Sequence, residues 1–194
     1  MALVGGSLGI IGCIVVVIGG ILLVAVAVVA LVYNSLISLR QRVDNAWSQI
    51  DVQLTKRYEL VPNLVETVKG YAKHEKDVFE NVAKARSAWA GASTVGEKAK
   101  ADASFAGALK TLFAVAENYP QLKANENFHL LQEQLDGIES KVAYARQFYN
   151  DSVLGYNTAI AQLPGVIIAP MLGFTAREYF KAEGDAQKAV KVQF

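Results

Sequence analysis

The sequence predicts an all-α protein: an N-terminal transmembrane helix, an antiparallel bundle of about four long helices, and a short C-terminal helix. Three observations predict this architecture. No side chain in residues 1–39 carries a charge. Proline occurs at only four positions, 62, 120, 164 and 170, and the stretches between them show helical rather than alternating periodicity. Between residues 128 and 163 that periodicity is a seven-residue repeat.

The N-terminal segment, residues 1–32, is expected to be a retained membrane anchor. A helix needs about 20 apolar residues to cross a bilayer core roughly 30 Å thick, and the uncharged stretch would reach about 60 Å as a helix. Residues 25–27 (Ala-Val-Ala) resemble a signal-peptide cleavage site, but the basic n-region of a signal peptide is missing. Residues 10–13 loosely resemble a lipoprotein cleavage box, although little chain precedes them. We favour retention over both alternatives.

Two features of this segment concern its orientation and its neighbours in the membrane. Arg40 and Arg42 follow the apolar stretch, so the positive-inside tendency places the C-terminal domain in the cytoplasm, with a periplasmic location left open. Gly5, Gly9 and Cys13 follow one another at four-residue intervals, a small-xxx-small spacing that lets helices approach closely in lipid. These three residues are candidate contacts between copies of the anchor.

The first helix is expected to leave the membrane without a break and to end near residue 60. Pro62 cannot continue the hydrogen-bond ladder, and the segment after it, beginning at Asn63, has the form of a new helix start. We favour a break there over a kink. A second helix is expected over residues 64–90. A capping box formed by Thr94 and Glu97 opens a third helix, which ends before Pro120.

The fourth helix carries the seven-residue repeat, which indicates helices packed at shallow angles with a left-handed supercoil. An up-and-down bundle with short loops supplies the partner helices that such a repeat requires. The predicted core draws on all four helices and consists of Trp47, Val68, Phe79, Leu112, Leu131, Leu135, Ile138, Val142 and Tyr149.

The C-terminal part, residues 164–194, breaks the pattern and completes a division into anchor (1–32), bundle (33–163) and tail. Residues 163–174 are apolar, too short to span a membrane, and interrupted by two prolines. They are expected to pack back on the bundle, with contact to lipid or to another subunit left open. A capping pattern at Thr175 and Glu178 indicates one more short helix through Phe180.

An uncharged polar stripe marks the first helix just outside the membrane. Its members fall three or four residues apart: Asn34, Ser38, Gln41, Asn45, Gln49 and Gln53. A solvated face usually carries more charge, so these amides and hydroxyls are candidates for packing against an identical helix, although simple solvation also explains them. Copies that assemble around their anchors would form a ring or cluster with cyclic symmetry.

No constellation of residues indicates catalysis, and we expect neither an enzyme nor a cofactor. A net charge of +1 gives no basis for binding nucleic acid. Glu126 and His129 have the Glu-x-x-His spacing of a di-iron bundle, but that site needs a second such pair. The other histidine, His74, has Tyr71 where the matching glutamate should be. Cys13 lies in the apolar segment, away from any partner for redox or nucleophilic chemistry.

The first two predicted helices also contain a pattern of residues that resembles the LemA family. The resemblance rests on Tyr33-Asn34-Ser35-Leu36, Arg42-Val43, Ala46-Trp47, Gln49-Ile50-Asp51-Val52-Gln53-Leu54, Lys56-Arg57, Leu60, Pro62-Asn63-Leu64-Val65-Glu66, Val68-Lys69-Gly70-Tyr71, His74-Glu75, Gly173-Phe174 and Tyr179-Phe180. It covers nearly the whole chain and is most specific over residues 47–75. It implies an anchored long-helix bundle in a bacterial membrane with no established enzymatic activity. A relative that takes part in building magnetosome membranes implies a role in organising or remodelling membrane.

Together these observations predict a non-enzymatic, homo-oligomeric scaffold in the bacterial inner membrane that contacts lipid and copies of itself. A monomeric adaptor that binds a partner protein through its bundle is the first alternative. A metal-dependent bundle enzyme is an alternative of another class.

Overall fold

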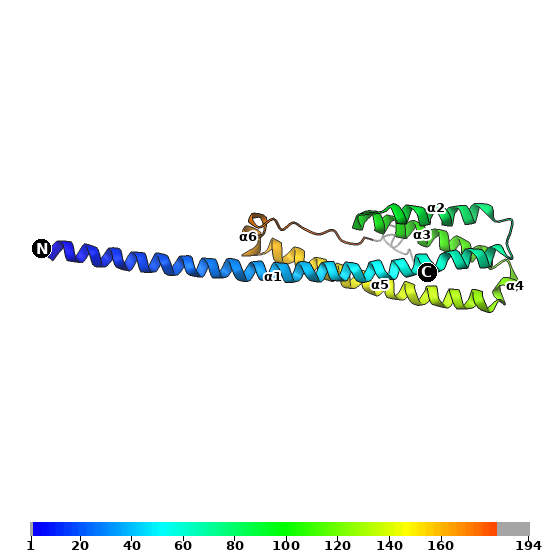
Figure 1. Ribbon diagram of the computed structural model, residues 1–194, viewed down its shortest axis with the longest axis horizontal. Helices are drawn as coiled ribbons and strands as arrows, with labels where there is room; N and C mark the ends of the chain where they lie inside the picture. The colour runs from blue at the N-terminus through cyan, green and yellow to red at the C-terminus, as the bar shows by residue number, and fades with distance from the viewer. Residues whose placement is uncertain (1, 182–194) are drawn as a thin grey trace, which may run out of the picture. The chain divides into compact units, whose positions relative to one another are not determined.

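The computed structural model describes residues 2–181, with side chains described for residue 12 and from residue 14 onward. Figure 1 shows an all-α chain, as predicted. Its described helices are α1 (Ala2–Lys69), α2 (Lys76–Gly91), α3 (Val95–Ala116), α4 (Pro120–Lys123), α5 (Glu126–Ala161) and α6 (Gly165–Met171). The described residues form two compact units, which we call the anchor unit (2–42 and 154–177) and the bundle unit (43–153 and 178–181). The division into anchor (1–32), bundle (33–163) and tail (164–194) that we drew from the sequence stays a prediction.

Helix α1 continues through Pro62 to Lys69, so the predicted break at this proline is wrong. A proline inside a helix costs about 3 kcal/mol, because it removes one hydrogen bond and crowds the preceding turn. Leu64 and Val68 are fully buried beyond it. Burying each such side chain contributes about 1.5–3 kcal/mol, which together offsets the cost of the proline. The helix instead ends at Lys69, and α2 begins at Lys76 rather than at residue 64.

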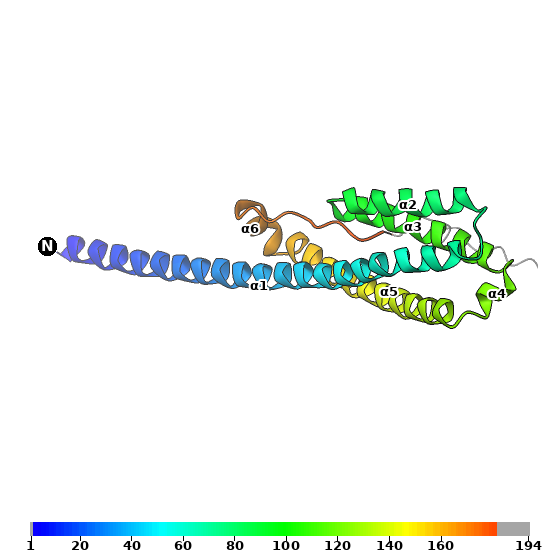
Figure 2. The same cartoon turned by 45° about the vertical axis from the view of Figure 1, so that its right-hand side comes forward.

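Helices α2 and α3 form a helical hairpin in the bundle unit and lie side by side in both views (Figures 1 and 2). The predicted capping box opens α3: the Glu97 backbone N–H donates to the Thr94 hydroxyl, and the Glu97 carboxylate accepts from the Thr94 backbone N–H. Three accepted hydrogen bonds from the backbone and hydroxyl of Ser93 and the backbone of Thr94 lower the pKa of Glu97 to about 2. The short helix α4, which opens with Pro120, was not predicted.

Helix α5 is the predicted fourth helix, and its repeat supplies much of the core. Of the predicted core residues, six are buried: Val68, Leu112, Leu135, Ile138, Val142 and Tyr149. The other three, Trp47, Phe79 and Leu131, are half-buried. Trp47 nevertheless packs edge-on against Tyr149 at a ring-centroid distance of 5.6 Å, which joins α1 to α5 inside the bundle unit.

The short helix near the C-terminus is α6, and it lies before the position that the capping pattern indicated. Residues 174–181 are extended instead of helical. Side chains of α5 hold this segment through its backbone. In the bundle unit the Asn150 amide accepts from the Phe180 N–H and donates to its carbonyl, and in the anchor unit Asn157 pairs in the same two ways with Arg177. The backbone N–H and carbonyl groups of Arg177 and Phe180 therefore have hydrogen-bond partners although this segment is not a helix.

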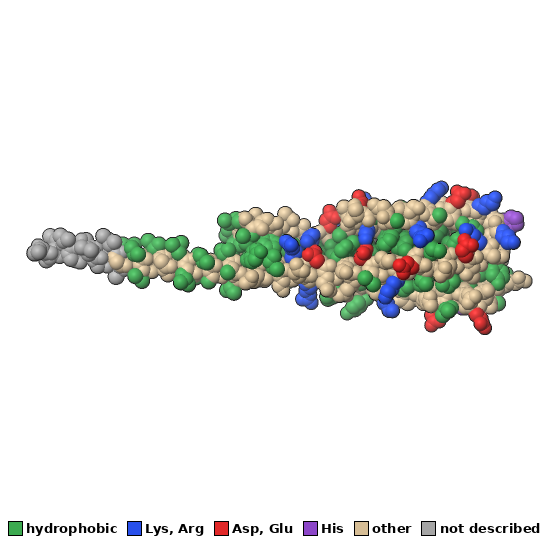
Figure 3. Space-filling view, in the orientation of Figure 1, with side chains coloured by type: hydrophobic (Ala, Val, Ile, Leu, Met, Phe, Trp, Pro, Cys, Tyr) green, Lys and Arg blue, Asp and Glu red, His purple; other side chains and the backbone are tan. Residues whose placement is uncertain are grey.

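One described helix, α1, is long and apolar enough to cross a membrane, and a second span arises only if α5 and α6 are counted together as one bent span. The most apolar window of α1 has a mean hydropathy of 3.3, and none of that window is buried. On the face shown in Figure 3, charged side chains gather over the bundle unit and are missing from the described apolar part of α1. The exposed apolar surface of α1 is the kind that requires lipid or protein cover.

Candidate assembly surface

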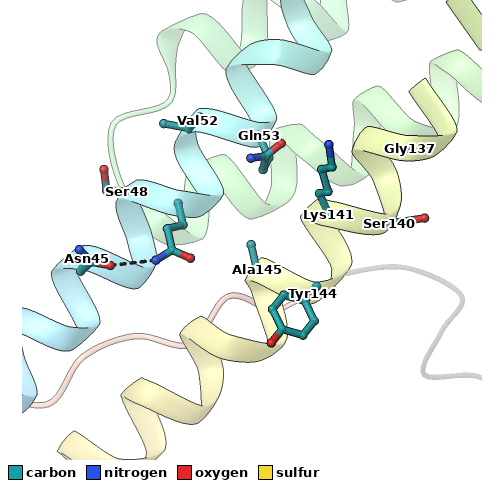
Figure 4. Close-up of a pocket in the computed structure, with 10 residues that line it drawn as sticks. Asn45, Ser48, Val52, Gln53, Gly137, Ser140, Lys141, Tyr144 and Ala145 are labelled. Carbon is teal, nitrogen blue, oxygen red and sulfur yellow. Dashed lines mark hydrogen bonds between the residues drawn. The ribbon is translucent and has the colours of Figure 1, made fainter. Parts of the chain in front are cut away.

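An open groove between α1 and α5 is the clearest concave surface of the bundle unit. It has a volume of about 600 Å³ and is shown in Figure 4. Ten residues line it: Asn45, Ser48, Gln49, Val52 and Gln53 from α1, and Gly137, Ser140, Lys141, Tyr144 and Ala145 from α5. We call these ten residues the amide groove.

The amide groove is almost free of charge, since Lys141 is the single charged side chain among its ten lining residues. The Gln49 amide nitrogen donates to the Asn45 side-chain oxygen over 2.9 Å, which is the dashed line in Figure 4. Two apolar side chains stand out from the groove, with 48% of Val52 and 74% of Tyr144 exposed. Amides carry both donors and acceptors, so this surface can hydrogen-bond to an identical copy of itself without charge repulsion.

A second groove follows along the same two helices, away from Asn45. It has a volume of about 560 Å³ and shares Gly137 and Lys141 with the amide groove. Its lining is charged, with Lys56, Glu59 and Glu133 beside apolar Leu60 and Leu130. The uncharged character of the amide groove is therefore local to one part of the α1–α5 face.

A buried cluster of charged groups fixes α1, α3 and α5 together behind this face. The Arg57 guanidinium donates to the carboxylates of Asp102 and Glu139, and Arg146 donates to the second oxygen of Asp102. Arg57 is 1% exposed and Asp102 is 2% exposed. Burial, followed by the positive charge of Arg57, lowers the pKa of Arg146 to about 10, so Arg146 stays charged at neutral pH. The cluster joins three helices at one level of the bundle.

Aromatic rings pack around the same cluster. The Arg57 guanidinium lies 5.4 Å from the centre of the Phe105 ring. Tyr58 stacks between Phe105 and Trp89, with centroid distances of 4.3 Å and 3.9 Å. Burial raises the pKa of Tyr58, which keeps its hydroxyl neutral. These aromatic groups form a packed core around Arg57. On another side of the cluster, Arg57 and Glu139 line a depression of about 440 Å³.

The residues of the predicted polar stripe fall into two groups, and the candidate anchor contacts are a separate set. Asn45, Gln49 and Gln53 line the amide groove. Asn34, Ser38 and Gln41 are exposed on α1 within the anchor unit. The candidate anchor contacts Gly5, Gly9 and Cys13 lie outside the residues whose side chains the structure describes.

Among the described residues, no group of three His, Cys, Asp or Glu side chains lies close enough to hold a metal ion. Glu126 and His129 are exposed beside a shallow depression near the start of α5. His74 is exposed in the turn before α2. Glu126 and His129 therefore lie near each other, but no third ligand joins them within the described part of the chain.

Sequence reasoning did not single out Arg57 and Asp102, although a signal for both was present. Leu36, Val43, Ile50, Arg57 and Leu64 follow one another at seven-residue intervals on α1, and the other four are buried apolar residues. Asp102 lies seven residues before Leu109 on the apolar face of α3. A charge that occupies an apolar row on one helix, together with an opposite charge on another row, indicates a buried ion pair.

Comparison with known proteins agrees with this architecture. The model of the LemA family matches residues 46–194. The magnetosome protein MamQ of Magnetospirillum gryphiswaldense is 26% identical over 201 aligned residues, which cover 84% of this chain and 74% of MamQ. The magnetosome protein MamQ 2 of Paramagnetospirillum magneticum is 25% identical over 188 residues, which cover 82% of this chain and 69% of the relative. Together with the apolar α1, these matches indicate a membrane-associated helical protein.

Proposed function

The chain belongs to the LemA family, and from that premise we propose that it is a non-enzymatic scaffold, anchored in the bacterial inner membrane by α1, whose copies assemble through the amide groove. The observation that carries this proposal is the low charge of the groove, in which Lys141 is the one charged side chain among ten lining residues from α1 and α5. Solvated helix faces usually carry more charge. The similarity to two magnetosome proteins supports a role in organising membrane.

Anchoring restricts how copies can meet. Copies that share one membrane and one orientation are related by rotation about an axis along the membrane normal, which yields cyclic assemblies. Residues near such an axis face the same residues of a neighbouring copy at the same height. A lysine or glutamate there would meet its own charge, whereas Asn45, Gln49 and Gln53 would meet groups with which they can pair. The composition of the groove suits this arrangement.

The two arginines after the apolar stretch favour a cytoplasmic bundle, and the anchors themselves would add contacts through Gly5 and Gly9. In this arrangement α1 supplies both the membrane contact and the subunit contact. In this proposal the protein acts through the number and spacing of its copies in the membrane and catalyses no reaction.

The proposal is tested by placing a charge in the groove. Gln49 is exposed, so Gln49→Lys leaves the fold intact. Two lysines about 6 Å apart across a contact repel by about 1 kcal/mol in water-like surroundings and about 3 kcal/mol in a partly desolvated interface. Each contact should therefore weaken by about 5- to 100-fold. Light scattering of the full chain in detergent or nanodiscs reports the copy number before and after the change.

Gln121→Lys is the matched control, because Gln121 is exposed on α4 outside the groove. The expected result is a wild-type assembly that Gln49→Lys reduces and Gln121→Lys leaves unchanged. A wild-type protein that is monomeric at micromolar concentration contradicts the scaffold. It would leave the monomeric adaptor, in which a foreign protein occupies the α1–α5 face.

A further inference from the structure

Among the residues that the structure describes, the segment around α6 exposes several large apolar side chains. Five stand out in sequence order: Leu163, Val166, Ile167, Met171 and Leu172. Ile167 is 61% exposed and Met171 is 81% exposed. The opposite face of α6 is buried, since Ile168 and Ala169 pack inward. The segment is therefore folded with its apolar surface outward, which a protein surrounded by water avoids.

Backbone hydrogen bonds at the C-terminal end of α6 fix how the chain leaves this helix. Gly173 has a positive φ of 74°, a conformation that glycine adopts readily. The Gly173 N–H donates to the Pro170 carbonyl and the Phe174 N–H donates to the Ala169 carbonyl, which is the Schellman pattern of a helix end. Phe174 is thereby turned inward, is 7% exposed, and packs edge-on against Tyr33 of α1 at 5.9 Å. Helix α6 is therefore tied to α1 inside the anchor unit.

Tyr33 follows the exposed apolar residues 14–31 of α1 and is itself 43% exposed. The 20 residues that precede it rise about 30 Å as a helix, which is the thickness of the bilayer core. Tyrosine is enriched at the boundary between that core and the headgroups. Contact with Tyr33 through Phe174 sets α6 at the same boundary. The axis of α6 is bent by 95° from that of α5.

The charges of the anchor unit suit the same boundary. Residues 152–176 contain no ionisable acid or base other than Tyr156, so they carry no charge at neutral pH. The charged side chains of the anchor unit are Arg40, Arg42 and Arg177, and the unit has no acidic residue. Arginine next to apolar surface is the composition of segments that lie in the interface of anionic membranes.

From these observations we propose that α6 is a second membrane contact, an interfacial helix that inserts Val166, Ile167 and Met171 into the headgroup–acyl boundary of the leaflet from which α1 emerges. We assign lipid as the occupant of this apolar surface, because Phe174 holds α6 against Tyr33, directly after the exposed apolar residues 14–31 of α1. The proposal rests on the membrane anchor of the proposed function and not on the assembly of copies.

The test measures the depth of α6 in a bilayer. Cys13 is the single cysteine, so Cys13→Ser gives a background in which one new cysteine can carry an environment-sensitive dye. Full-length protein is labelled at Ile167→Cys, at Val24→Cys in the apolar part of α1, or at Ser87→Cys on the exposed face of α2. Each is reconstituted in two sets of vesicles of phosphatidylcholine and phosphatidylglycerol, one with acyl chains brominated close to the headgroup, the depth proposed for residue 167, and one with chains brominated near their end, the depth of residue 24.

The expected result is that bromine quenches the dyes at 167 and 24 and leaves the dye at 87 unaffected. Quenching at 24 without quenching at 167 overturns the proposal and leaves the anchor standing. A dye at 167 that is shielded from water but not quenched shows a protein cover, such as a second copy, and also overturns it. Absence of quenching at both 24 and 167 overturns the anchor together with the interfacial helix.

Discussion

Removing the Asp102 carboxylate, which lies at the centre of the buried cluster, is expected to lower the free energy of unfolding. The loss should exceed that caused by removing any other single charge in the bundle unit. The Asp102 side chain is 3% exposed and accepts hydrogen bonds from Arg57 and Arg146. In Asp102→Ala the buried guanidinium of Arg57 keeps only Glu139, a carboxylate that is half exposed. Breaking a buried ion pair on one side costs about 3–5 kcal/mol, because an uncompensated charge stays in the core.

Two variants separate this cost from ordinary loss of charge. Glu139→Gln removes a carboxylate whose side chain is 50% exposed, and exposed ion pairs contribute about 0–1 kcal/mol. The double variant Arg57→Leu with Asp102→Leu removes both buried charges and leaves Arg146, whose side chain is 22% exposed and can reach water. Replacing a buried pair by apolar residues of similar volume is often close to neutral. The double variant should therefore lose less stability than Asp102→Ala alone.

The measurement is urea unfolding of the full chain in a mild detergent, followed by circular dichroism of the helical signal. The free energy of unfolding of each variant is compared with that of the unmodified protein. Two results would contradict this role of the cluster. One is a free energy of unfolding for Asp102→Ala within about 1 kcal/mol of that of the unmodified protein. The other is a loss of stability in Asp102→Ala that is smaller than the loss in Glu139→Gln.

Two further predictions concern single positions. Glu97 has a pKa of about 2 in the folded protein, below its ordinary value of 4.5, so the stability that its capping bonds supply is complete above pH 4.5 and is lost as pH falls toward 2. The melting temperature of Glu97→Gln should vary less with pH across this window, and parallel curves for the two proteins would contradict the assignment. Gly165→Ala should lower the melting temperature and shift α6, because the added Cβ overlaps the carbonyl oxygen of Ala159. Gly107→Ala, where no atom lies within 4 Å of the added Cβ, should leave the melting temperature unchanged or raise it.

The parts of the fold that were predicted correctly are those with local signals. The capping box of Thr94 and Glu97 and the repeat along α5 each arise within a few turns of one helix. The helix through Pro62 depends on packing energy from the other helices, which single-sequence patterns do not contain. The extended tail depends on Asn150 and Asn157, which lie 30 and 20 residues from their partners. Such partners cannot be read from a local pattern.

The candidate site was predicted in part for a similar reason. The amides of the groove were visible as a stripe on one helix, since Asn45, Gln49 and Gln53 are separated by four residues. That α5 supplies the other wall, with Tyr144 and Ser140, follows only from the packing of two distant segments. The exposure of α6 was likewise left open by its composition, because an apolar segment interrupted by prolines suits both a core and a membrane surface.

The position of Arg57 in an apolar row has a consequence for the register of α1. That row repeats every seven residues, so a slide of α1 by seven residues past α3 and α5 would keep most apolar contacts. It would also bring Ile50 or Leu64 to the level of Asp102, which would keep only Arg146, and it would move the buried guanidinium of Arg57 away from both of its carboxylate partners. The cost of an unpaired buried charge, about 3–5 kcal/mol, is comparable to the whole stability of many domains. The cluster therefore selects one register among several that hydrophobic packing alone would permit, and that register determines which residues of α1 face α5 in the amide groove.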